Sequence, residues 1–248
     1  MNHEEYERMY RFEDRYWWFI ARRRLIASLI GDRHAKDGSL AILDIGCGTG
    51  AMLDELAPFG RVTGADFAVE ALDFCRERSD KYPLTRADAR CLPFASNTFD
   101  VVTAMDIIEH IDNDKAASAE IFRVLKPGGQ VYITVPAYQS LWSEHDEALH
   151  HHRRYTSPMM RDVLQRVGFR VEKLSYTVSS LLPGVWLYRK IAAIFKRDDG
   201  HEKKADLVDF SGPVNSALIK LSRLETELVR KTNLPFGVTV ACVAEKPR

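Results

Sequence analysis

The sequence predicts an α/β fold in which helices cover both faces of a doubly wound, mostly parallel sheet. Residues 41–135 alternate short apolar runs, turns and helix-like segments, a pattern typical of such sheets. At 248 residues the chain is long enough to bury a full-sized core. Its composition, 46% hydrophobic and 28% charged, is that of a globular protein.

Brief apolar runs mark the expected strands, which are Ala41–Ile45, Arg61–Ala65, Pro83–Ala87, Phe99–Ala104, Gln130–Val135, Arg170–Thr177 and Gly237–Glu245. Between them we expect helices at Gly50–Ala57, Val69–Ser79 and Lys115–Leu125, the last closed by Pro127 and Gly128. A further helix is expected from Ser157, with Ser157 as N-cap, Pro158 in the first turn and Gly168 just past the end.

We expect a single domain over residues 1–248, with a helical cover at 1–38 and a helical insertion or lid at 179–236, between strands six and seven. Within the insertion, 181–197 is apolar with basic borders and 198–206 is polar. Residues 213–231 form an expected amphipathic helix whose apolar positions are Val214, Leu218, Leu221, Leu224 and Leu228.

Charge and cysteine content exclude several classes of protein. Lys and Arg number 35, as do Asp and Glu, so there is no overall basic footprint for nucleic acid. The 4 cysteines stand far apart and form no zinc-type pairs, which favours a reduced, cytoplasmic protein. The N-terminus is too charged for a secretory signal, and no apolar run reaches the roughly 20 residues of a spanning helix.

The stretch LDIGCGTG, residues 43–50, places three glycines after a strand and before a helix, where the backbone can turn sharply and a ligand can approach closely. With Ala51 it also fits a dinucleotide fingerprint. However, Asp44 would repel a pyrophosphate and attract a cation. Asp66 ends the second strand and could bind ribose hydroxyls, and Asp88 follows the third strand at the same edge.

Together with ADARCLPFASNTFDVV and LKPGG, this stretch resembles the class I S-adenosylmethionine-dependent methyltransferases. The resemblance implies seven strands in the order 3214576 with strand 7 antiparallel. It also implies S-adenosyl-L-methionine as cofactor, held by Asp44, Gly46, Gly48, Gly50, Asp66, Phe67, Asp88, Ala89 and Met105.

RYWWFIARRR, residues 15–24, resembles an N-terminal segment that lies over the cofactor in a subgroup of these enzymes. On that interpretation Trp17 and Trp18 cover the cofactor, and Arg22 and Arg23 pair with its carboxylate. The alternative is a helix that anchors to the core and has a basic outer face.

Two places offer a histidine as general base, a group required only when the acceptor starts protonated. His110, in MDIIEHI, follows strand four; its alternative role is to cap or pack a helix. The stretch HDEALHHHRRYT, residues 145–156, follows strand five and resembles a motif of a bacterial branch of the family. There we predict that His145, Arg154 and Tyr155 contact the acceptor, the alternative being a solvated loop.

If Ser143 caps a short helix, Asp146 and His150 would lie on one face and could pair. We expect no metal site, because three adjacent histidines cannot all point at one ion and VPAYQS supplies no acidic ligand pair.

The sequence therefore predicts methyl transfer from S-adenosylmethionine to an oxygen of a small-molecule, glycan or lipid-linked acceptor. Two other hypotheses stay open, an NAD-dependent oxidoreductase and a non-catalytic, membrane-peripheral protein that keeps a cofactor pocket. Segment 181–197 is interpreted as an interfacial membrane contact, a cover for an apolar substrate, or a lid or homodimer helix.

Overall fold

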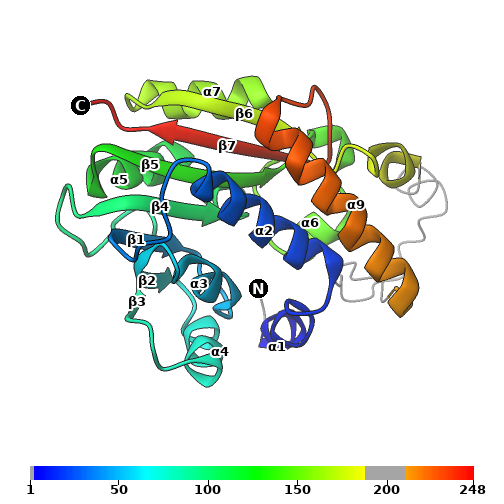
Figure 1. The fold of residues 1–248 in the computed structure, drawn as a ribbon, viewed down its shortest axis with the longest axis horizontal. Coiled ribbons are helices and arrows are strands. Elements are labelled where there is room, and N and C mark those ends of the chain that lie inside the picture. The colour runs from blue at the N-terminus through cyan, green and yellow to red at the C-terminus, as the bar shows by residue number, and fades with distance from the viewer. Residues whose placement is uncertain (1–2, 188–209) are drawn as a thin grey trace.

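A seven-stranded sheet lies at the centre of the computed structural model, which describes residues 3–187 and 210–248 (Figure 1). The strands are β1 (Leu40–Ile45), β2 (Gly60–Asp66), β3 (Leu84–Arg86), β4 (Phe99–Met105), β5 (Leu125–Pro136), β6 (Arg170–Thr177) and β7 (Thr239–Glu245). Their order is β3-β2-β1-β4-β5-β7-β6. Strands β1 to β5 pair in parallel, whereas β7 is antiparallel to β5 and β6. The predicted order 3214576 is confirmed.

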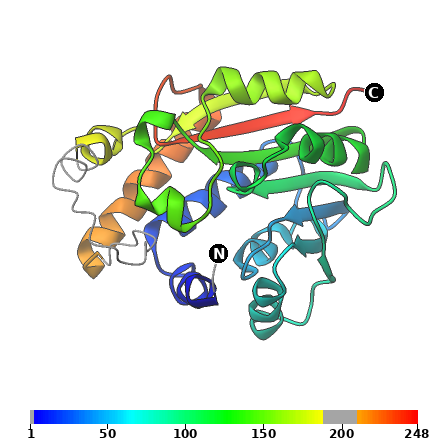
Figure 2. The ribbon, with the colours of Figure 1, turned by 180° about the vertical axis from the view of Figure 1, so that it is seen from behind.

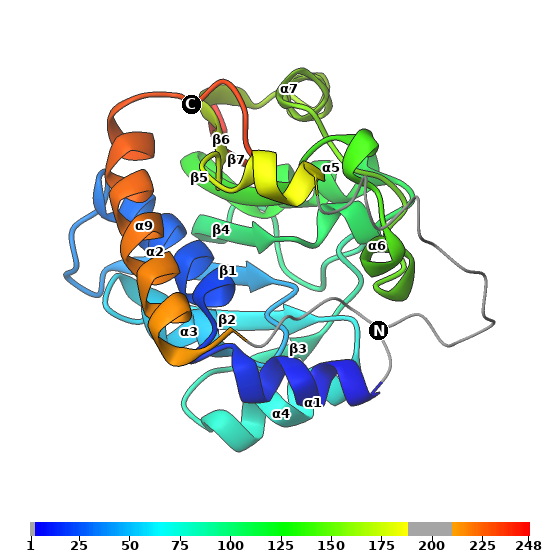
Figure 3. The same ribbon diagram turned by 90° about the vertical axis from the view of Figure 1, so that its right-hand side faces the viewer.

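Helices cover both faces of the sheet (Figure 3). One apolar core joins the sheet to α2 (Trp17–Gly31), α3 (Ala51–Leu56), α4 (Val69–Arg78) and α9 (Gly212–Lys231). The other core joins it to α5 (Asp114–Val124) and α7 (Ser157–Arg166). In the view from behind, the green segment between β5 and α7, which contains α6 (Glu144–Ala148), folds over the end of the sheet (Figure 2). Because helices cover both faces of the sheet, this end of the sheet is the part that remains for binding a ligand.

The N-terminal segment is helical, as the sequence predicts. It consists of α1 (His3–Phe12) and α2, and α1 packs beside α4. Helices α2 and α9 lie side by side (Figure 1). Glu225 of α9 accepts a hydrogen bond from the backbone N–H of Ser179 at 3.0 Å, which ties this helix to the end of β6.

Two local boundaries differ from the sequence prediction. Strand β5 begins at Leu125, directly after α5, so Pro127 and Gly128 lie within the strand rather than in a loop before it. The pairing of β5 with β4 is irregular there. The N-cap of α7 is Thr156 instead of Ser157, because the Thr156 hydroxyl accepts the N–H of Met159.

The predicted amphipathic helix in the insertion exists as α9, but most of its apolar stripe does not face the core. Leu224 is 71% exposed, and the exposed set also includes Val214, Leu221 and Leu228. Thr226 and Val229 are buried instead, and Leu218 packs near Tyr16 and Trp17. The packing of α9 against α2 determines which face of α9 is buried. Residues 182–187 are helical, whereas residues 188–197 of the predicted segment and the polar stretch 198–206 lie outside the described residues.

Over the described ranges 3–187 and 210–248, no helix has the length and apolar character needed to cross a membrane.

Candidate active site

The glycine turn after β1 requires glycine at each position. Gly46, Gly48 and Gly50 have φ values of 69°, 55° and 91°, in the left-handed region that side chains rarely adopt. A Cβ at Gly50 would lie 2.5 Å from the Sγ of Cys75, and one at Gly48 would lie 2.9 Å from the Cε of Met9. The backbone here therefore forms a tight cradle at the carboxyl end of β1.

Asp44 reaches this cradle as a buried carboxyl group. Its Oδ1 accepts a hydrogen bond from the Thr103 hydroxyl at 2.5 Å, while its Oδ2 is buried and has no hydrogen-bond partner among the described residues. Burial raises the pKa of Asp44 to about 7. A cationic group placed beside Oδ2 would satisfy this oxygen and favour its charged form.

Asp66, at the end of β2, closes the other side of the cradle. Its carboxylate accepts the backbone N–H groups of Gly48 at 3.0 Å and Ala68 at 2.9 Å. Burial raises the pKa of Asp66. These two bonds fix the carboxylate at the edge of the sheet, where it can accept further hydrogen bonds.

A cavity of about 1400 Å³ opens over the carboxyl ends of β1, β2 and β4. It exceeds the roughly 300–1,000 Å³ of a typical single-ligand pocket, so it has room for a cofactor and an acceptor together. Of the sequence-predicted site residues, those that line it are Trp17, Arg22, Arg23, Asp44, Gly46, Gly48, Asp66, Phe67, Asp88, Ala89, Met105, His110, His145 and Arg154. Gly50 and Tyr155 do not line it.

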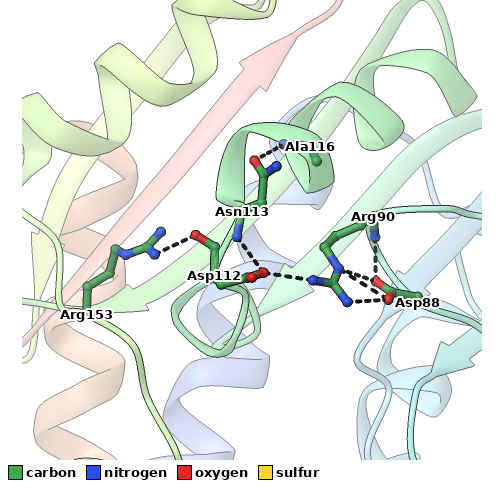
Figure 4. A network of polar contacts seen from close by, with 6 residues as sticks. All are labelled: Asp88, Arg90, Asp112, Asn113, Ala116 and Arg153. Carbon is green, nitrogen blue, oxygen red and sulfur yellow. Dashed lines mark hydrogen bonds and ion pairs between the residues drawn. The ribbon is translucent and has the colours of Figure 1, made fainter.

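The rim of the cavity near β3 combines an exposed ring with an ion-pair network. Phe67 is 64% exposed, and the Arg86 guanidinium lies 5.7 Å from its ring centroid. Arg90 bridges the carboxylates of Asp88 and Asp112, each at 2.8 Å (Figure 4). The network links the ends of β3 and β4 across the mouth of the cavity.

The arginines of α2, predicted to pair with the cofactor, are paired with protein groups in this structure. Arg22 forms an ion pair with Asp106, and Arg23 donates to the Glu13 carbonyl at 2.6 Å. Trp17 is buried, and its indole N–H has no hydrogen-bond partner among the described residues. These contacts anchor the helix, and its role as a cover for the cofactor stays a prediction.

The loop after β5 is organised around Asp146, but not as a helix-face pair with His150. Helix α6 ends at Ala148, and His150 lies beyond it in the left-handed region, at a φ of 56°. Asp146 instead contacts the Nδ1 of His151 at 2.9 Å and accepts two hydrogen bonds from Arg154, at 2.7 and 2.9 Å. These partners hold the pKa of Asp146 far below its usual range, although burial opposes them.

Arg154 and Tyr155, predicted to contact the acceptor, are both buried. Arg154 is 4% exposed, and its guanidinium donates hydrogen bonds to Asp146 and to the Ala137 carbonyl. Tyr155 is 1% exposed and belongs to the core, where its hydroxyl donates to Asp114 at 2.8 Å. Tyr155 therefore lies away from the cavity, whereas Arg154 lines it while its guanidinium is bound to Asp146.

The structure also brings His151, from the loop after β5, to Glu109 and His110, which the sequence already places together after β4. The ring of His110 meets the ring of His151 edge-on, with centroids 4.6 Å apart, and Glu109 lies beside them. Burial lowers the pKa of His110 to about 3, so its imidazole is neutral near pH 7. No local signal could have paired these histidines, because they are on different loops.

The comparisons with known proteins agree with this geometry. A family model described as a methyltransferase domain matches residues 43–133, from β1 through most of β5. Residues 43–133 therefore match a methyltransferase domain. The methyltransferase domain is thereby favoured over the dinucleotide-binding alternative.

Relatives share this domain but differ in what they methylate. A sterol 4-C-methyltransferase of Caenorhabditis elegans is 38% identical over 120 residues, 44% of this chain and 36% of that protein. A ubiquinone/menaquinone biosynthesis C-methyltransferase of Desulfotalea psychrophila is 35% identical over 113 residues, 44% of each. The chain thus spans less than half the length of either relative.

Solved structures extend the likeness of fold to most of the chain. A phosphoethanolamine N-methyltransferase 2 of Haemonchus contortus, in complex with S-adenosyl-L-methionine, superposes with a TM-score of 0.60 and 20% identity. The match covers 91% of this chain and 52% of that one.

Proposed function

We propose that this chain transfers a methyl group from S-adenosylmethionine to an oxygen of a small, predominantly apolar acceptor. The observation that carries the proposal is the single cavity that joins the glycine cradle and its two carboxylates to a histidine-lined end. A donor and an acceptor bound in one such cavity would react at close range, and alignment alone can contribute up to about 7–11 kcal/mol.

The residues of the cradle fit the cofactor in charge and shape. The unpartnered Oδ2 of Asp44 suits a cationic group, and the left-handed backbone at Gly46 and Gly48 forms the turn that lines this part of the cavity. Asp66 is proposed to accept the ribose hydroxyls, Phe67 to flank the adenine and Asp88 to contact its amino group. When bound, the cofactor supplies a methyl group on an already activated, positively charged sulfur.

The acceptor is proposed to bind between an apolar wall and the histidine-lined end. Leu181, Val185, Phe210 and Leu218 line one side of the cavity. His110, His145 and His151 line another part of it. A ring-bearing or lipid-linked molecule with one hydroxyl would match both. The sterol and quinone substrates named for the relatives are also apolar rings, although those enzymes are named for transfer to carbon.

Calorimetry with S-adenosylhomocysteine tests the cofactor site. We expect binding by the wild type, a large loss of affinity in Asp66→Ala, and wild-type affinity in Asp80→Asn, an acidic control exposed on the surface. Failure of the wild type to bind, or equal binding by Asp66→Ala, would reject the assignment.

Turnover is then followed with prenylated and sterol-like hydroxyl compounds, and fragmentation of the product by mass spectrometry distinguishes O-methyl from C-methyl. No turnover on any of them would favour the non-catalytic hypothesis.

Peripheral membrane contact through 181–197 and homodimer formation stay predictions, because residues 188–209 lie outside the described part of the chain. Two described residues of this segment, Trp186 and Leu187, are 47% and 54% exposed. Their exposure supports a contact of the segment with an apolar surface. Liposome flotation compared with Trp186→Ser, and light scattering for the oligomeric state, test the two predictions.

A further inference from the structure

Glu109 is a buried acid with no protein partner. It lies in the short 3-10 helix Ile108–His110 after β4 and is 0% exposed. Neither carboxyl oxygen has a hydrogen-bond partner within the described residues, although the residue lines the cavity. A charge buried in this way is normally paired or bound to a metal ion. Glu109 must therefore either keep its proton or, when ionised, bind a cation.

Two imidazoles lie beside this carboxyl group. One potential ligand atom from each of Glu109, His110 and His151 falls within 4.8 Å of the other two. A tetrahedral site with metal–ligand distances of about 2.0–2.1 Å would bring these atoms to roughly 3.3 Å from one another, a change within reach of small side-chain rotations. All three residues line the same cavity, so an ion among them would face bound ligand.

One of the two imidazoles already has a ring nitrogen held by an oxygen acceptor. The Nδ1 of His151 lies 2.9 Å from the Asp146 carboxylate, which leaves its Nε2 as the nitrogen for a ligand. The ring of His110 lies against that of His151, with centroids 4.6 Å apart. Metal-binding histidines typically show this arrangement, in which an outer acceptor fixes the tautomer and the ring orientation.

The loop that supplies His151 is fixed in place by the chain itself. The backbone N–H of His152 donates to the Glu109 carbonyl at 2.7 Å, and Arg154 forms a paired contact with Asp146. These bonds hold the loop after β5 against the loop after β4. The three side chains therefore meet as a consequence of the fold.

The other acidic side chains beside the cluster are paired, whereas the carboxyl group of Glu109 has no partner among the described residues. Asp106 is paired with Arg22, and Asp146 is paired with Arg154. One divalent cation bound to an ionised Glu109 would leave one positive charge, which suits the oxygen anion formed when an acceptor hydroxyl loses its proton.

We propose that Glu109, His110 and His151 bind a divalent transition-metal ion, of the class of Zn²⁺ or Co²⁺, with one coordination position open to the cavity. Two histidines and one carboxylate form a ligand set that zinc uses in catalytic sites with an exchangeable fourth position. The open position would take the acceptor hydroxyl and favour loss of its proton to solvent water, which would leave the oxygen anion to receive the methyl group. That role rests on the proposed function, whereas metal binding itself does not.

The test measures metal binding by the full chain without an affinity tag. Chelator-treated protein is titrated with Co²⁺, followed by its visible absorption, and with Zn²⁺ in competition with a chromophoric chelator. We expect one ion per chain. Glu109→Gln and His151→Gln should each weaken binding at least about 100-fold, and Asp146→Asn about 10- to 100-fold through His151.

His150→Asn is the matched control, because it removes a histidine from the same loop and asparagine tolerates the left-handed backbone at that position. It should bind metal as the wild type does. Glu109→Gln also removes the unpartnered charge, so it should fold, as circular dichroism can check. A wild type that binds no ion at micromolar metal, or a Glu109→Gln variant that binds equally well, would overturn the proposal.

S-adenosylhomocysteine binding by the same chelator-treated samples separates this inference from the proposed function. Metal binding without cofactor binding would support the site and reject the methyltransferase proposal. Cofactor binding without metal binding would support the methyltransferase proposal and reject the metal site.

Discussion

Replacing Asp44 by asparagine should stabilise the cofactor-free protein and weaken its cofactor binding. Asp44 is buried, and its pKa rises from 3.8 to about 7 in the folded chain. This shift is about three pKa units, and at 1.36 kcal/mol per unit it costs the folded state about 4 kcal/mol once the group is ionised. Asparagine keeps the acceptor for Thr103 and removes the charge.

The sign of the pH dependence follows from the direction of the shift. Because the folded carboxyl keeps its proton up to about pH 7, the folded state binds more protons than the unfolded state above pH 3.8. The free energy of unfolding of the wild type should therefore fall as pH rises through that window. Asp44 should lower the free energy of unfolding by about 1–2 kcal/mol at about pH 5 and by about 4 kcal/mol at about pH 8.

Urea unfolding at these two pH values measures the effect. The difference in unfolding free energy between Asp44→Asn and the wild type should grow with pH, whereas Asp80→Asn, at an exposed site, should show no such trend. Loss of a charged hydrogen bond worth about 1.5–3 kcal/mol should also weaken S-adenosylmethionine binding about 10- to 100-fold. Parallel pH profiles for Asp44→Asn and the wild type would refute the reasoning, and unchanged cofactor affinity would refute the role of Asp44.

Other substitutions test separate features. Gly50→Ala should lose about 2–4 kcal/mol of stability in urea, because its Cβ meets a sulfur at 2.5 Å, whereas Gly38→Ala, also at positive φ but in open space, should lose only the strain of about 1–2 kcal/mol. Tyr155→Phe should cost about 1 kcal/mol and leave cofactor affinity unchanged; a loss of turnover in a fully stable variant would contradict its structural role. Phe67→Ala should weaken S-adenosylhomocysteine binding without lowering the melting temperature, since the ring is 64% exposed.

Local chemistry explains why so much of the cofactor cradle could be predicted. Left-handed backbone at Gly46 and Gly48 requires glycine, and parallel strands bring the residues after each strand to one edge, so Asp44, Asp66 and Asp88 could be placed from sequence order. Cap positions were less certain. Thr156 and Ser157 are both good caps, and only the backbone decides which of them is used.

The loop after β5 shows the limit of sequence reasoning. Helical spacing pairs Asp146 with His150, but α6 ends before that residue and the chain turns back, which gives Asp146 to His151 and Arg154. The sequence predicts that Tyr155 contacts the acceptor, yet it is buried in the core.

The sequence by itself determined the α/β class, the strand order through its family motifs and the glycine cradle, because each depends on neighbours in the chain. Only the tertiary structure decided which face of α9 is buried and which residues meet Glu109. Those outcomes depend on contacts between distant segments, such as α2 with α9 and the loop after β4 with the loop after β5, and no local pattern encodes such contacts.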